Sequence, residues 1–78
     1  MSVRQFVKVD PERYQHRWYA VAWGKTIFGT WAVVRSWGRI GTNWAQCKSE
    51  VFENERAARA EAEAQARRRL RRGYTETN

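Results

Sequence analysis

The hydrophobic pattern of the chain changes at Asn54, and this change is what most limits the possible folds. Up to residue 52, apolar and polar side chains alternate in short runs separated by turn residues, which is typical of half-buried strands. From residue 54 the sequence NERAARAEAEAQARRRLRRGY is rich in Ala, Glu and Arg, which are strong helix formers. The chain is therefore expected to form an α+β domain, with one C-terminal helix packed on a sheet.

Four segments carry the alternating pattern, and each is predicted to form a strand: residues 3–9, 17–23, 30–37 and 45–52. In the third segment the alternation does not decide which face belongs to the core. If the pleat continues through Gly38, then Arg35, Trp37 and Arg39 point to the same side. The indole would then lie between two guanidinium groups.

The helix has sequence signals at both ends and along one face. Asn54 is placed to act as the N-cap, and Gly73 as the C′ residue beyond the C-cap. Small side chains at Ala58, Ala62 and Ala66, followed by Leu70, recur every four residues, so the helix is expected to lie close on the sheet. We predict a single domain over residues 1–74 and a frayed tail over residues 75–78.

The length and the cysteine content exclude several kinds of stabilisation. The chain has 78 residues, one Cys and one His, so Cys47 has no partner for an internal disulfide and no zinc set is present. No apolar run approaches the roughly 18 residues that a membrane span needs, and the start MSVRQFVKVD lacks the apolar region of a secretory signal. We expect a soluble, cytoplasmic monomer without a metal or another cofactor.

The charge indicates the class of partner. Fifteen Lys and Arg against eight Asp and Glu give a net charge of +7, which favours nucleic acid or an acidic membrane or protein surface. The alternative is that this charge only keeps the domain soluble. The arginines of residues 67–72 also have two interpretations. They could contact phosphates, or they could only complement the helix dipole, which cations at a helix C-terminus do without any ligand.

The stretch RSWGRIG, residues 35–41, combines features that suit nucleic acid. Cations neutralise phosphates, an exposed ring stacks on a base, and glycines let the backbone approach closely. A core position for Trp37 is the alternative, since tryptophans are mostly buried. His16 and Cys47 lie in different segments with no signature that links either one to a catalytic partner, so we do not expect an enzyme.

The segment WAVVRSWGRIG resembles the signature of WGR domains, which are named for the tripeptide that is here Trp37, Gly38 and Arg39. The resemblance extends over nearly the whole chain and is greatest to short bacterial proteins made of one WGR domain. It includes VDPER at 9–13, RWY at 17–19, FGTW at 28–31 and RRGY at 71–74.

This resemblance implies a curved antiparallel sheet of about four strands with one helix packed across it. In the DNA-damage-dependent poly(ADP-ribose) polymerases, the WGR domain binds duplex DNA at a break near the 5′ terminus, and the signature Trp packs against the terminal nucleotide. Trp37 is thereby implied to stack. The signature Arg, which matches Arg39, partly contacts neighbouring domains in those proteins, and the resemblance implies no catalytic activity.

Two functions follow as hypotheses. The first is a module that binds duplex DNA at ends or nicks and is associated with the nucleoid; the second is a protein-interaction adaptor that uses the exposed Trp and Arg cluster. Tyr74 could contact nucleic acid or close the helix end against the core. The candidate nucleic-acid-binding residues are Trp37, Gly38, Arg39, Arg35, Lys48, Arg67, Arg71, Arg72 and Tyr74.

Overall fold

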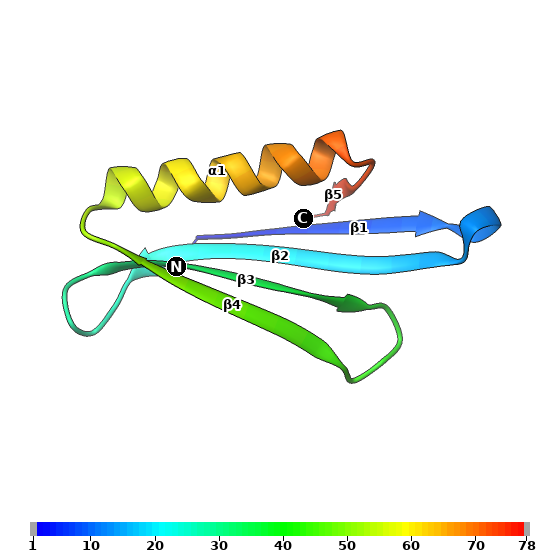
Figure 1. The fold of residues 1–78 in the computed structure, drawn as a ribbon, viewed down its shortest axis with the longest axis horizontal. Helices are drawn as coiled ribbons and strands as arrows, with labels where there is room; N and C mark the ends of the chain where they lie inside the picture. The colour runs from blue at the N-terminus through cyan, green and yellow to red at the C-terminus, as the bar shows by residue number, and fades with distance from the viewer. Residues whose placement is uncertain (1, 78) are drawn as a thin grey trace.

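The structure, a computed structural model, describes residues 2–77 and contains one helix lying across a curved antiparallel sheet (Figure 1). The strands are β1 (Ser2–Asp10), β2 (Gln15–Lys25), β3 (Trp31–Arg39), β4 (Ala45–Phe52) and β5 (Thr75–Thr77). They are arranged in the order β4-β3-β2-β1-β5, and each is antiparallel to its neighbours. A short 3₁₀ turn, η1 (Pro11–Arg13), joins β1 to β2, and α1 (Glu55–Arg71) follows β4. This arrangement confirms the α+β fold class.

The strand at the C-terminus is the main departure from the expected fold. Residues Thr75–Thr77 form β5, which pairs with residues 5–7 of β1, so the prediction of a frayed tail is wrong for these three residues. Asn78 lies outside the described residues. The sheet therefore has five strands rather than about four, and the four predicted strands match β1 to β4 to within two residues at each end.

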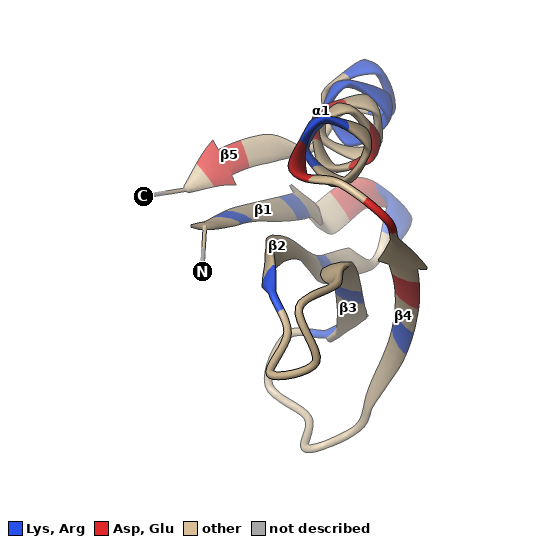
Figure 2. Cartoon of the chain, turned by 90° about the vertical axis from the view of Figure 1, so that its left-hand side faces the viewer, with Lys and Arg blue, Asp and Glu red and all other residues tan. Residues whose placement is uncertain are grey.

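The helix covers one face of the sheet, and the sheet curves around it (Figure 2). The core lies between these two layers, where Phe6, Tyr19, Val21 and Val33 are buried against the alanines of α1. Cross-strand pairing places Tyr19 opposite Trp37 and Val21 opposite Arg35, so the odd-numbered residues of β3 share the helix-facing side. The alternation in the sequence did not decide which face of β3 belongs to the core; in the structure it is the face with Trp31, Val33, Arg35 and Trp37.

Both ends of α1 carry the caps that the sequence indicates. The Asn54 side chain accepts a hydrogen bond of 2.8 Å from the backbone N–H of Ala57, which satisfies one of the free donors of the first turn. At the other end Gly73 has φ +91°, Tyr74 N–H donates to Arg69 C=O, and Gly73 N–H donates to Leu70 C=O. These two bonds form a Schellman motif, which turns the chain back towards β1.

The buried stripe of α1 differs from the expected one at its C-terminal end. Ala58, Ala62 and Ala66 are buried as predicted, but Leu70 is 44% exposed, so the prediction for Leu70 is wrong. A helix turns about 100° per residue, so a strict four-residue repeat drifts around its surface. Leu70 is about 120° away from Ala58, whereas Arg69 is only about 20° away and therefore faces the sheet.

An ion pair holds β5 against β1. Arg4 donates from Nε and Nη2 to the two carboxylate oxygens of Glu76 at 2.8 and 2.7 Å. This hydrogen bonding to Arg4 lowers the pKa of Glu76 and raises the pKa of Arg4.

Among residues 2–77 no helix is long and apolar enough to cross a membrane.

Replacement of the helix cap tests the first of these contacts. Asn54→Ala should lower the free energy of unfolding by about 1 kcal/mol, because a backbone N–H of the first turn loses its acceptor. Urea unfolding followed by circular dichroism measures this difference. Asn54→Asp keeps an acceptor and should stay near the wild type; an equal loss in both variants would contradict the capping role.

Replacement of the β5 carboxylate tests the ion pair through its pH dependence. Because folding lowers the pKa of Glu76, the pair stabilises the fold above the ordinary Glu pKa of about 4.3, and this contribution is lost as the pH falls through the folded value. Both side chains are partly solvated, so Glu76→Gln should cost only about 0.2–1 kcal/mol at pH 7. The difference from wild type should shrink in thermal unfolding at pH 3; a difference that persists there would show that the charge is not its source.

Candidate functional site

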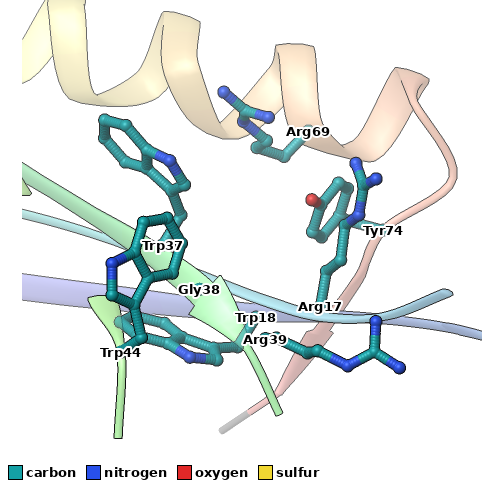
Figure 3. A pocket seen from close by; sticks show the side chains of 8 residues that line it. All are labelled: Arg17, Trp18, Trp37, Gly38, Arg39, Trp44, Arg69 and Tyr74. Carbon is teal, nitrogen blue, oxygen red and sulfur yellow. The ribbon is translucent and has the colours of Figure 1, made fainter. Parts of the chain in front are cut away.

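A pocket of about 390 Å³ opens between the C-terminal end of α1 and the end of the sheet where β3 finishes and β2 begins. Figure 3 shows indole rings along one side, the ring of Tyr74 on the opposite side, and Arg69 reaching from the helix towards the space between them. Four aromatic residues, three arginines and a glycine line it: Trp18, Trp37, Trp44, Tyr74, Arg17, Arg39, Arg69 and Gly38. We call these eight residues the arginine–tryptophan pocket.

The pairing of β2 with β3 brings two of the arginines together. Arg17 is directly opposite Arg39, and Tyr19 directly opposite Trp37, on the face that carries the helix. Like charges directly opposite each other destabilise a sheet unless a counter-charge is near. Within residues 2–77 neither arginine forms an ion pair, so this end of the sheet has an uncompensated positive charge.

Gly38 is required by close packing around it. A Cβ atom at this position would lie 2.7 Å from the backbone oxygen of Trp44 and 2.9 Å from Nε1 of the Trp18 indole. The turn that brings Trp44 back is fixed by Gly41, with φ +87°, and by the Thr42 hydroxyl, which donates to Arg39 C=O at 2.9 Å. The glycine of the signature therefore lets two tryptophan residues approach β3.

Arg69 is held in place by aromatic rings. Its guanidinium carbon lies 4.1 Å from the centre of the Tyr19 ring and 5.7 Å from that of Tyr74, both within the range of cation–π attraction. Arg69 Nε and the Tyr19 hydroxyl are both buried, and neither has a hydrogen-bond partner among residues 2–77. Buried polar atoms normally have partners, so these two unpartnered atoms are an unusual feature of the contact between Arg69 and Tyr19.

Tyr74 has two structural roles at the pocket. It follows the Schellman motif, packs edge-on against Tyr19 with ring centres 6.4 Å apart, and so closes the helix end against the core. The Lys8 ammonium lies 5.8 Å from the centre of the Tyr74 ring and donates to Arg72 C=O at 2.7 Å. Tyr74 thus seals the core and lines the pocket at the same time.

The electrostatic character of the pocket is positive. None of the lining residues is a carboxylate, and Arg69, like the other two arginines, forms no ion pair in the described part of the chain. Figure 2 shows further arginines gathered at the C-terminal end of α1, while acidic residues lie towards its beginning. No group of three or more His, Cys, Asp or Glu residues that could hold a metal ion occurs within residues 2–77. The arrangement suits a flat, anionic ligand.

The structure brings together four of the nine candidate residues. Trp37, Gly38, Arg39 and Tyr74 line the pocket. Arg35 lies earlier on β3, on the same face as Trp37, and Lys48 is opposite it on β4. The remaining candidate cations are exposed and lie on α1 or directly after it: Arg67, Arg71 and Arg72. None of these three residues lines the pocket, and neither do Arg35 and Lys48.

Four lining residues were not among the candidates. Arg17 and Trp18 are brought in by the β2–β3 register, which the sequence could have suggested by aligning the two strands of the hairpin. Trp44 is 61% exposed at the rim, and its place depends on the turn before β4. The sequence could have distinguished Arg69 from the neighbouring arginines, because the rotation of about 100° per residue in an α-helix places Arg69 on the face of the buried alanines.

Enlarging Gly38 tests the packing at the pocket. Gly38→Ala should lower the free energy of unfolding by about 1–3 kcal/mol, because the new methyl group meets a backbone oxygen that cannot move freely. Urea unfolding measures the effect. Ser36→Ala, on the same face of β3, is the control and should change stability by less than about 0.5 kcal/mol. A Gly38→Ala variant as stable as this control would contradict the close approach of Trp44.

Comparison with known proteins identifies the family of the chain. The chain matches the WGR domain family over residues 3–78. A relative from Sinorhizobium fredii (strain NBRC 101917 / NGR234), "Uncharacterized protein y4dW", is 33% identical over 67 residues, which cover 86% of this chain and 32% of the relative. The chain thus spans about a third of that protein's length, and no solved structure matches. Since the family match covers nearly the whole chain, this protein belongs to the WGR domain family.

Proposed function

We propose that this protein is a non-catalytic module that binds duplex DNA at an end or a nick through the arginine–tryptophan pocket. The observation that carries the proposal is the composition of that pocket, which has four aromatic residues, three arginines and no carboxylate. Nucleotides offer the two complementary groups, a flat base and an anionic phosphate. No single charged patch would supply both kinds of contact.

The three arginines suit phosphate better than lysines would. A guanidinium group presents its N–H donors in a planar fork, which matches two oxygens of one phosphate. Arg69 is already oriented by its stacking on Tyr19, so it loses little side-chain freedom when it binds. A phosphate between Arg17 and Arg39 would also relieve the repulsion between these directly opposed cations.

The size of the pocket favours an end over an uninterrupted duplex. A volume of about 390 Å³ is at the low end of the range for small-ligand sites and accommodates one nucleotide rather than a double helix. A terminal nucleotide can enter such a pocket, because its outer face is not covered by the next base pair. Trp37, half-buried beside the core, is then the stacking ring, and the more exposed Trp44 lies at the rim.

The other predicted cations have a different part in this proposal. Arg35, Lys48, Arg67, Arg71 and Arg72 do not line the pocket, so they would contact phosphates along the duplex next to the bound end. Such contacts raise the affinity for any duplex and make it depend on salt, but they carry no preference for an end.

A pair of helix variants separates the two kinds of cation. Arg69→Gln should weaken binding to an open duplex about tenfold and lower the slope of log K against log salt by about 0.9. Binding to a covalently closed dumbbell of the same sequence should change much less. Fluorescence anisotropy with 5′-phosphorylated blunt DNA and with the dumbbell, at two salt concentrations, measures both effects.

The matched control is Arg67→Gln, two residues away on the same helix and outside the pocket. It should weaken binding to the open and closed DNA by equal factors and leave the ratio between them unchanged. Equal binding of wild-type protein to both DNA forms would contradict the end preference. Absence of tight DNA binding at physiological salt would instead favour a protein adaptor, with the pocket recognising an acidic protein partner.

A further inference from the structure

The edge of the sheet formed by β4 is uncovered along its length. β4 is the last strand in the sheet order, and among residues 2–77 it pairs only with β3 (Figure 1). Every residue of β4 except Phe52 is exposed. The backbone groups on its outer side are therefore free to pair with another strand.

Most of the features that usually protect an edge strand are missing from β4. The strand is eight residues long, contains no proline, and pairs with β3 in one unbroken register without a bulge. The opposite edge of the sheet, by contrast, ends in the three-residue β5. A long, regular and exposed edge is a template for strand addition.

Two charged residues of β4 have no counter-charge in the described part of the chain. Lys48 and Glu50 lie on the helix-facing side of β4, and neither forms an ion pair within residues 2–77. Directly opposite Lys48 on β3 is Arg35, another cation. Like charges at opposite positions are unfavourable, so an acidic group on the free side of Lys48 would stabilise this part of the sheet.

We propose that β4 pairs antiparallel with β4 of a second copy of this chain, around a two-fold axis at Ser49. In this register Lys48 lies opposite Glu50 of the second copy, and Glu50 lies opposite its Lys48. The two sheets then join into one, with both helices on the same face. Each Lys48 gains a carboxylate on the side away from Arg35.

The charge pattern selects this register over its neighbours. Moving the axis to Lys48 places this lysine opposite itself, and moving it to Glu50 places two glutamates opposite each other. An axis between two residues shifts the register by one residue, which would put side chains of opposite faces against each other. Only the axis at Ser49 pairs both charges with their opposites while keeping the faces aligned.

The interface is a single pair of eight-residue strands, which is small compared with that of a permanent dimer. The dimer should therefore form reversibly and depend on protein concentration. Sedimentation equilibrium of the protein without nucleic acid, from about 10 μM to about 1 mM, covers the range in which small interfaces associate. The wild type is expected to shift from the mass of one chain to that of two.

Charge reversals give the decisive comparison. Lys48→Glu and Glu50→Lys should each weaken self-association about tenfold or more, because each creates two pairs of like charges across the axis. Mixing these two variants in equal amounts should restore association, since the acidic strand of one is opposite the basic strand of the other. The double variant Lys48→Glu/Glu50→Lys should also dimerise, as its charges are again complementary.

Several outcomes would overturn the proposal. A wild type that stays monomeric up to about 1 mM excludes the dimer. Reversals that leave the dimer unchanged, or a mixture and double variant that fail to recover it, exclude this register. Both positions are exposed, so the variants should fold normally, and circular dichroism of each confirms that a loss of association is not a loss of structure. Arg56→Glu, on the exposed surface of α1, is the matched control and should associate like the wild type.

Discussion

The close contact between α1 and the sheet is the constraint on which the rest of the structure depends. Ala58, Ala62 and Ala66 have such short side chains that the helix can lie directly over Tyr19, which is 1% exposed. At this distance Arg69, on the same side of the helix, reaches the Tyr19 ring at 4.1 Å and extends over the pocket. Larger residues on this face would lift the helix and remove one wall of the site.

The parts of the fold that depend on neighbouring residues could be predicted from the sequence. The helix, its Asn54 cap, its Gly73 terminus and the four alternating strands are all set by local pattern and propensity. β5 could not be predicted in this way, because its three residues pair with a strand about 70 positions earlier and are held there by the Arg4–Glu76 ion pair. The prediction that Leu70 belongs to the buried stripe was wrong, because a repeat of four residues only approximates the helical period of about 3.6 residues.

The site was predictable where the signature itself carries it. Trp37, Gly38, Arg39 and Tyr74 are the pocket-lining residues that were also candidates from the sequence. The places of Arg17, Trp18, Trp44 and Arg69 depend on strand register, a turn and helix rotation. Two alternatives raised by the sequence are compatible in the structure. Trp37 packs against the core and also lines the pocket, and Tyr74 closes the helix end while its ring faces the same space. A small domain thus uses one set of rings for stability and for its candidate site.

The distribution of the five tryptophans allows a direct test of the central claim, that this pocket is the binding site. Trp18, Trp37 and Trp44 line the pocket, whereas Trp23 and Trp31 pack together towards the other end of the sheet, 6.1 Å between ring centres. The measurement is a titration of ¹⁵N-labelled protein with a short blunt duplex, followed through the indole N–H signals by NMR. If the pocket is the binding site, the three pocket indoles shift while Trp23 and Trp31 stay unchanged. Shifts confined to Trp23 and Trp31, or shifts of all five indoles alike, would contradict binding at the pocket.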